Sequence, residues 1–225
     1  MSNEKRRPMA AGKAKEKPLT RIFSLIRKHL GKTTPVVAFK SPFQVLISTV
    51  LSQRTRDENT EIASKRLFSR YPSPEKLASA DLRSIERLIK PSGFYRVKAR
   101  RVKAIAKEIL SRFGGKTPGG IEELLSLKGV GRKTANCVLC YAFGKPAIAV
   151  DVHVHRIANR IGIVSTKGPE QTEEALAAIL PKRAWLGVNE LLVKFGRKTC
   201  RPIGPKCGEC PLSAWCDYGI AHLAK

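Results

Sequence analysis

Four cysteines near the C-terminus have a spacing suited to metal binding. They are Cys200, Cys207, Cys210 and Cys216, in the pattern C-x6-C-x2-C-x5-C. A short terminal loop has no core that could bury four thiols, and thiolates are the soft ligands that zinc and iron–sulfur clusters prefer. Disulfides are the alternative, but we see no pattern of a secretory signal at the N-terminus. Zinc sites usually pair two short C-x2-C units, so the single short unit favours a [4Fe–4S] cluster.

A glycine-containing hairpin, Leu127–Gly131, stands between two expected helices. Glycine permits positive φ and lets another group approach the backbone closely. The helix that follows begins with unpaired N–H groups at the positive end of its dipole. The hairpin is therefore typical of a site that docks phosphate, and an ordinary inter-helix turn is the alternative.

Lys133 and Asp151 are the candidate catalytic residues. Lys133 follows the hairpin by one helical turn, where a bound phosphate backbone would lie close to it. A lysine becomes a nucleophile when burial and neighbouring cations lower its pKa, although a phosphate contact is the simpler interpretation. Asp151 follows the apolar run 147–150 and precedes a helix, so it is an N-cap candidate and also a candidate proton acceptor. Together they would suit cleavage of an N-glycosidic bond.

The charge of the chain points to a polyanionic partner. Its 225 residues include 43 Lys and Arg against 18 Asp and Glu, a net charge of +25. Nucleic acid is the expected partner, and an anionic membrane surface is the competitor. No apolar run approaches the length that crosses a bilayer, so we expect no membrane span.

The most basic internal segment, Lys90–Lys116, contains nine basic residues and one acidic residue. Val97, Val102, Ala104, Ile105 and Ile109 predict an amphipathic helix whose polar face is basic. Candidate phosphate contacts on that face are Lys98, Arg100, Arg101 and Lys103.

Helical periodicity continues through the chain from Leu19, without alternating strand patterns or internal repeats. The sequence therefore predicts an all-α fold. Cys137 and Cys140 share one face of an apolar helix, where free cysteines behave as small hydrophobic residues, so we expect them in the core.

Three motifs and the cysteine pattern follow one another in a characteristic order. The motifs are LSQRTRDENT (Leu51–Thr60), GFYRVKA (Gly93–Ala99) and LKGVGRKTANCVLCYAFGKPAIAVDVHVHR (Leu127–Arg156). With the cysteines they resemble the endonuclease III family of base-excision DNA glycosylases, from about residue 35 to Cys216.

The resemblance implies two helical domains with DNA in the groove between them. A six-helix barrel with the helix-hairpin-helix would span residues 35–145. A cluster domain would combine the N-terminal helix, residues 19–34, with residues 146–225. Residues 1–18 contain six basic and two acidic residues and almost no large apolar ones, so their composition predicts a basic disordered arm.

The resemblance also assigns roles. Lys133 would be the Schiff-base nucleophile and Asp151 the second catalytic group, acting on a base flipped out of the duplex. Either Gln53 or Arg54 would fill the vacated space. Lys128 stands where the family usually has proline. The expected DNA contacts are Gln53, Arg54, Lys98, Arg100, Arg101, Lys128, Gly129, Val130, Gly131, Arg132, Thr134 and His153.

The implied activity is that of a bifunctional DNA glycosylase and AP lyase. It would remove damaged, oxidised pyrimidines from double-stranded DNA, act on abasic sites, and work as a monomer at the nucleoid in the cytoplasm. One alternative is a monofunctional mismatch-thymine or adenine glycosylase, whose family members lack the motif lysine. The other is a cluster-bearing module that binds DNA without catalysis.

Overall fold

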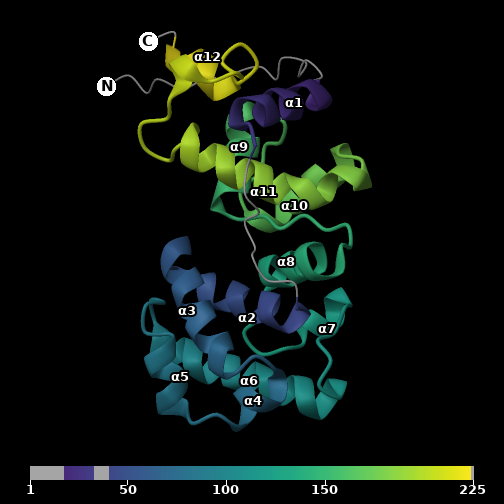
Figure 1. The fold of residues 1–225 in the computed structure, drawn as a ribbon. Helices are drawn as coiled ribbons and strands as arrows, with labels where there is room; N and C mark the ends of the chain where they lie inside the picture. Colours follow the sequence, from purple (N-terminus) through teal and green to yellow (C-terminus); the bar gives the residue numbers. More distant parts are fainter. Residues whose placement is uncertain (1–17, 33–40, 224–225) are drawn as a thin grey trace, which may run out of the picture.

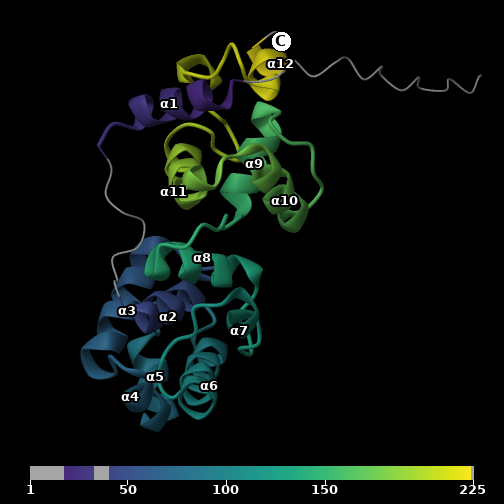
Figure 2. The same cartoon turned by 90° about the vertical axis from the view of Figure 1, so that its right-hand side faces the viewer.

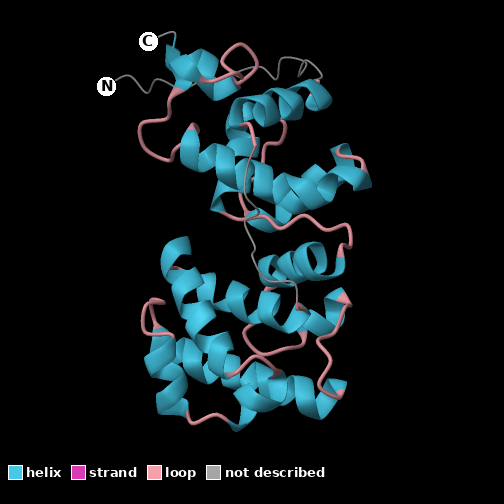
Figure 3. Cartoon of the chain, in the orientation of Figure 1, coloured by secondary structure: helices cyan, strands magenta, loops and turns pink. Residues whose placement is uncertain are grey.

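The computed structural model describes residues 18–32 and 41–223, and within these ranges it contains helices and no strand (Figure 3). The all-α prediction is confirmed. The arm predicted at residues 1–18 lies, apart from Pro18, outside the described residues, as do residues 35–40 of the expected barrel. The helices are α1 (Leu19–Leu30), α2 (Pro42–Ser52), α3 (Asp57–Arg70), α4 (Pro74–Ser79), α5 (Leu82–Leu88), α6 (Tyr95–Phe113), α7 (Ile121–Leu125), α8 (Arg132–Phe143), α9 (Val152–Ile161), α10 (Pro169–Ile179), α11 (Lys182–Lys198), the 3-10 turn η1 (Cys207–Glu209) and α12 (Asp217–Leu223).

The helices form two groups, one above the other in Figures 1 and 2. The lower group contains α2 to α8, and the upper group contains α1 with α9 to α12. Each group has its own hydrophobic core. The chain passes from one core to the other between Ala147 and Ile148, which belong to the first and second core respectively.

Helix α2 is the centre of the lower group. Its sequence PFQVLISTVLS is apolar on nearly every side, and the residues from Val45 to Leu51 are all buried. A helix that is hydrophobic all round must be surrounded by other helices. Helices α3, α6 and α8 pack against α2, and α8 contributes Cys137 and Cys140 as buried residues. Their prediction as core residues is confirmed.

The upper group joins the two ends of the described chain. Ile22 and Ile26 of α1 are fully buried in the same core as Ile157 of α9 and Leu192 of α11. The N-terminal helix therefore packs with the C-terminal helices. No helix within the described residues is long and apolar enough to cross a membrane.

Two ion pairs connect the groups. Asp57, at the start of α3, pairs with Arg197 near the end of α11. Arg132, at the start of α8, pairs with Glu173 of α10 at 3.0 Å. Both pairs lie at helix ends that face the other group.

Candidate active site

The hairpin between α7 and α8 has the geometry that its glycines allow. Gly129 has φ +89°, in the left-handed region that favours glycine. A Cβ at Gly129 would also lie 2.6 Å from Cδ of Arg101, so a side chain there would have to displace the Arg101 side chain. The Val130 side chain is buried and its amide donates to the Leu127 carbonyl at 3.0 Å, which closes the turn. The exposed backbone of Gly129 and Gly131 is left facing outward.

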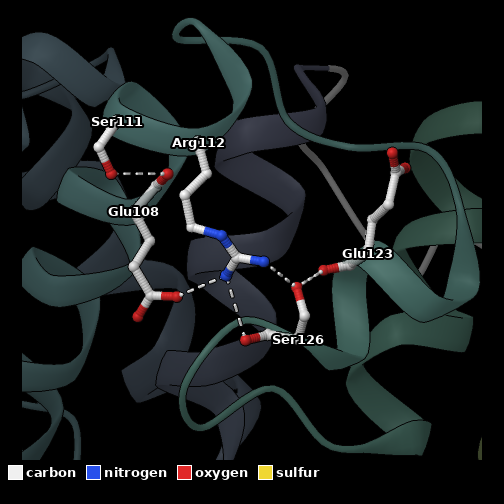
Figure 4. A network of polar contacts seen from close by, with 5 residues as sticks. All are labelled: Glu108, Ser111, Arg112, Glu123 and Ser126. Carbon is white, nitrogen blue, oxygen red and sulfur yellow. Dashed lines mark hydrogen bonds and ion pairs between the residues drawn. The ribbon is translucent and has the colours of Figure 1, made fainter.

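An arginine from α6 anchors the start of this hairpin (Figure 4). The Arg112 guanidinium donates to the Ser126 carbonyl at 3.4 Å and to the Ser126 hydroxyl at 2.8 Å. It also pairs with Glu108 at 3.2 Å, and Ser126 Oγ donates to the Glu123 carbonyl. Because Ser126 ends α7, this network fixes the hairpin relative to α6.

Lys133 lies in the first turn of α8 and is partly exposed. The residue one turn further along, Cys137, shares its helix face and is buried. Burial raises the pKa of the Cys137 thiol, while the charge of Lys133 and its hydrogen bonding act against that rise. The Lys133 amine is therefore next to a buried, neutral thiol.

Asp151 caps the N-terminus of α9, as predicted. Its Oδ1 accepts hydrogen bonds from the amides of His153 and Val154, both at 2.9 Å. The carboxylate also contributes to the raised pKa of Cys137, which places it within electrostatic reach of the thiol beside Lys133. Lys133 and Asp151, far apart in the sequence, thus lie around the same residue.

Two buried asparagine side chains bind the segment that leads to Asp151. The run 147–150 leads into Asp151, and the Asn136 side chain of α8 donates to the Ile148 carbonyl at 3.0 Å. From the other side, the Asn189 side chain of α11 donates to the Ala149 carbonyl at 2.7 Å and accepts from the Tyr141 hydroxyl. The segment before Asp151 is therefore bound both to the helix of Lys133 and to the upper group.

His153 occupies the first turn of α9 and is half-buried. Burial lowers the pKa of its imidazole, Arg156 and Arg197 lower it further, and the carboxylates of Asp151 and Asp57 oppose the shift. The imidazole is therefore neutral near pH 7. Its Nδ1 lies 3.1 Å from Nη2 of Arg156, and a Cβ at Gly196 would lie 2.5 Å from it. His153 is held in place by α9 and α11, beside Asp151.

The loop between α2 and α3 contains both candidates for filling the flipped-base gap, and it places them in different environments. Gln53 is half-buried: its Oε1 accepts from Arg101 at 2.9 Å, and its Nε2 lies 3.4 Å from Oγ1 of Thr134, which is itself buried. Arg54 is exposed and has φ +51°. Gln53 is thus bound to the site wall, and Arg54 forms the tip of the loop.

All four C-terminal thiols line one pocket, together with Phe195, Leu212 and Tyr218. All six cysteines are free. Helix α9 approaches the pocket: Arg160 Nη1 lies 3.6 Å from Sγ of Cys200, and Arg156 donates to the Cys200 carbonyl at 2.9 Å. Within the described ranges, no three His, Cys, Asp or Glu side chains are arranged to hold a single metal ion.

Comparison with known proteins decides the family. A family model described as HhH-GPD superfamily base excision DNA repair protein matches residues 47–182. Endonuclease III of Thermotoga maritima is 55% identical over 177 residues, which are 79% of this chain and 83% of that protein. The chain belongs to the endonuclease III family. It is a base excision repair DNA glycosylase, as the order of its motifs predicted.

Solved structures agree with this family assignment. A trapped endonuclease III–DNA covalent intermediate has a TM-score of 0.86 and 33% identity, covering 91% of this chain and 97% of that chain. A thermostable thymine-DNA glycosylase has a TM-score of 0.78 and 26% identity, covering 90% and 96%. The endonuclease III fold therefore extends over nearly the whole chain.

One expected DNA contact of this family member is wrong. Lys98 is only 3% exposed, and its ammonium is bonded to three protein oxygens, so it cannot reach a phosphate. Val97 of the predicted apolar stripe is 50% exposed, whereas Val102, Ile105 and Ile109 are buried as predicted. The buried residues of α6 include Lys98, Val102, Ile105 and Ile109, spaced by four, three and four positions. That spacing was the signal that could have identified Lys98 as an inward-facing residue.

The other basic candidates differ in their exposure and in whether another residue already binds their side chain. Arg100 and Lys128 are exposed, Arg101 is bound to Gln53, and Arg132 is bound to Glu173. Lys103 donates to the Ala80 carbonyl at 2.6 Å, at the end of α4. Of this basic set, Arg100 and Lys128 are the side chains best placed to contact phosphate.

Phe94 was missed by reasoning from the sequence. It is 63% exposed and has φ +59°, although a large aromatic side chain favours burial and a negative φ. A Cβ at the preceding Gly93 would lie 3.3 Å from the Arg54 carbonyl, so Phe94 and Arg54 occupy adjacent turns. The aromatic residue directly after a glycine in GFYRVKA was the available signal.

Proposed function

We propose that this protein removes oxidised pyrimidines from duplex DNA and cleaves the strand at the resulting abasic site. Lys133 is the nucleophile, and Asp151 assists. The observation that carries this proposal is that the buried Asn136 side chain binds the segment before Asp151 to the helix that begins beside Lys133, at the junction of the two groups of helices. AP lyase activity is a feature of the endonuclease III family, and Lys133 occupies the position of its motif lysine.

The reaction begins at the amine of Lys133. Once it has lost a proton, the Nζ of Lys133 attacks C1′, and the bond from C1′ to the base nitrogen breaks with its electron pair leaving on the base. Loss of a proton from the amine and opening of the sugar ring give an imine between Nζ and C1′. The imine acidifies C2′, so removal of a proton there expels the 3′ phosphate by β-elimination. Water then hydrolyses the imine and frees the lysine.

Asp151 is positioned to stabilise the positive charge that develops on the sugar. Both capping hydrogen bonds fall on Oδ1. Among the described contacts, Oδ2 is therefore the oxygen left for the substrate, where it faces the developing oxocarbenium ion or accepts the proton of the amine. The cap fixes the carboxylate before DNA binds, so little reorganisation is needed during reaction.

The space vacated by the flipped base is filled from the tips of two turns. Arg54 and Phe94 are exposed, adjacent and both at positive φ. The guanidinium of Arg54 can donate to the orphaned base, and the ring of Phe94 can stack between bases. This assignment favours Arg54 over Gln53, because Gln53 is bonded to Arg101 and Thr134.

The hairpin docks the phosphate backbone near the lesion. The exposed backbone of Gly129 and Gly131 and the first amides of α8 offer donors without reading the base. Lys128 and Arg100 add charge at the exposed surface. His153 and Thr134 shape the wall of the site through their contacts with Arg156 and Gln53.

The cysteine pocket suits a [4Fe–4S] cluster better than zinc. The four thiols line one pocket and contain a single short C-x2-C unit, and each would bind one iron of the cluster. The cluster would have a structural role, because it would order the basic residues from Lys194 to Lys206. We assign residues 19–34 and 146–225 to this domain and residues 35–145 to the barrel. The two hydrophobic cores support this division, with Ala147 still packed in the core of the barrel.

Duplexes with single defined lesions test the proposal. We expect wild-type protein to release thymine glycol, to nick abasic sites, and to become covalently attached to lesion DNA on borohydride reduction. A duplex with a G·T mismatch serves as the comparison, since a thymine-DNA glycosylase is among the structural relatives. Release of mismatched thymine without trapping would contradict the proposed activity.

A further inference from the structure

Lys98 has an unusual environment for a lysine. Its ammonium donates to the Leu51 carbonyl at 2.7 Å, to Oγ1 of Thr55 at 2.7 Å and to Oγ of Ser92 at 2.8 Å. An ammonium group has three N–H donors, so every one is used. All three acceptors are neutral, and burying a charge without a carboxylate costs free energy. Such a costly arrangement needs an explanation beyond the stability of the fold.

The three acceptors belong to two separate segments. Leu51 lies in the last turn of α2 and Thr55 in the α2–α3 loop, and Ser92 lies in the turn before α6. Ser92 Oγ also donates to the Leu51 carbonyl at 2.9 Å, so that carbonyl accepts two hydrogen bonds. Lys98 thus connects the α2–α3 loop with the turn before α6.

Both segments carry a strained residue at the tip. Arg54 has φ +51° and Phe94 has φ +59°, and neither is glycine. The left-handed region is unfavourable for a residue with a side chain, so such conformations persist only where the surroundings impose them. The Lys98 ammonium binds Thr55, which follows Arg54, and Ser92, which lies two positions before Phe94. One buried side chain thus connects both tip segments and can hold them in the strained form.

We propose that Lys98 is a positioning residue for base extrusion, because its buried ammonium holds the tips of the α2–α3 loop and the α5–α6 turn in the conformation that enters DNA. The proposal rests on the proposed function, since it concerns how Arg54 and Phe94 act there. It assigns to Lys98 a role that requires no contact with DNA.

A second lysine of α6 provides the matched control. Lys103 also donates to a main-chain carbonyl, that of Ala80 at 2.6 Å, but this carbonyl ends α4 and belongs to neither tip. A lysine that merely caps a helix end would behave like Lys103. A lysine that positions the two tips would not.

The experiment measures two single-turnover rates at saturating enzyme: base release from a thymine glycol duplex, and nicking of a duplex with a preformed abasic site. For Lys98→Met we expect base release to fall roughly 10- to 100-fold, the loss typical of misplaced groups. Nicking should fall less, because an abasic site has no base to extrude. Lys103→Met should leave both rates unchanged. With wild-type protein, the fluorescence of a 2-aminopurine placed opposite the lesion should increase when the damaged base is extruded. With Lys98→Met this increase should be lost.

A double-mutant cycle decides whether Lys98 acts through the loop. If it does, Lys98→Met in an Arg54→Ala background should cost less than in wild type, because the tip residue is already missing. Additive losses, or equal effects of Lys98→Met and Lys103→Met, would overturn the proposal. If Lys98→Met fails to fold in thermal melts, Thr55→Val removes one acceptor instead and should show the same separation of rates. Absence of wild-type base release would overturn the proposed function and would be seen before any variant is compared.

Discussion

The start of α8 and the inward face of α6 each carry a lysine, and the structure surrounds these two lysines in different ways. Lys133 is partly exposed, next to a buried thiol and within reach of the segment that carries Asp151. Lys98 is buried and bonded to three neutral oxygens. One amine can meet a substrate, and the other can only hold protein segments together.

This difference shows that local charge density does not identify the lysines that contact DNA. Both lysines lie in strongly basic stretches of a chain with net charge +25. What separates them is what surrounds each ammonium group, because Lys133 is itself in phase with the buried Cys137. Lys98 is in phase with Val102, Ile105 and Ile109 and therefore points into the lower core, whereas Lys133 lies at a helix start beside the hairpin. The predictions below test the comparison, beginning with the largest expected effect.

Lys133→Gln should abolish strand nicking and borohydride trapping, because glutamine has no lone pair on an amine to attack C1′. Binding to lesion DNA should persist, since the hairpin backbone is unchanged. Gel trapping and equilibrium binding on the same lesion duplex measure the two properties. The control is Lys128→Gln, an exposed lysine of the hairpin, which should weaken binding and retain trapping. Undiminished trapping in Lys133→Gln would move the nucleophile to another residue.

Asp151→Asn should slow base release by about 10²-fold, a magnitude typical of general acid–base and charge stabilisation. Asparagine caps helices nearly as well as aspartate, so the melting temperature should change little. Single-turnover rates and thermal melts separate the two effects. Asp81 offers a matched control: it caps α5 by accepting from the Ser84 amide at 2.9 Å, in the lower group. If Asp81→Asn slows base release as much as Asp151→Asn, the effect is structural.

Much of this site was predictable because its main residues stand at helix boundaries. The hairpin, the start of α8 and the cap at Asp151 follow from local rules about glycine and carboxylates. The network beneath the tips was not predictable, because it joins Leu51, Thr55, Ser92 and Lys98 across more than forty positions of sequence. Gln53 and Arg54 could not be distinguished either, since only the fold shows that Arg101 and Thr134 bind the first of them.

Cys207→Ser should remove the visible absorbance that we expect of the cluster and should lower stability of the C-terminal region. Serine is a poor ligand for iron, and the pocket would lose one of its four thiolates. Absorbance spectra and iron content per protein measure the loss. Cys140→Ser is the control, because Cys140 is buried in the lower core and its thiol donates to the Ala147 carbonyl. Stoichiometric zinc in a colourless, active wild-type protein would contradict the cluster.

Lys98 should also leave a signature in the dependence of stability on pH. Burial, with a smaller contribution from the charge of Arg101, lowers the pKa of Lys98 to about 8, against about 10.4 for lysine in an unfolded chain. Between these values the unfolded state binds more protons, so the contribution of Lys98 to stability rises with pH from about 8 to about 10.4. Below pH 8 both states are protonated, and the cost of burying the charge is felt in full.

Urea unfolding of wild type and Lys98→Met at pH 7, 8.5 and 10 measures this contribution, since the other groups cancel in the difference. We expect the free energy of unfolding of wild type, relative to Lys98→Met, to increase across this range. A constant difference would mean that Lys98 keeps its ordinary pKa and is not buried as described.

The smallest expected effect concerns the exposed face of α6. Arg100 is exposed and directly precedes Arg101, whose side chain lies against Gly129 of the hairpin, and Arg100→Ala should weaken binding to all duplexes by a similar factor. Each lost phosphate contact lowers the slope of log K against log salt by about 0.9, because one fewer counterion is released. Fluorescence anisotropy between 50 and 200 mM salt, roughly the range over which such slopes are measured, gives both quantities. Arg83→Ala, on the exposed side of α5, should leave the slope unchanged. Because Lys98 is only two positions from Arg100 but faces inward, Lys98→Met should also leave the slope unchanged, and a lower slope in Lys98→Met would restore it as a phosphate contact.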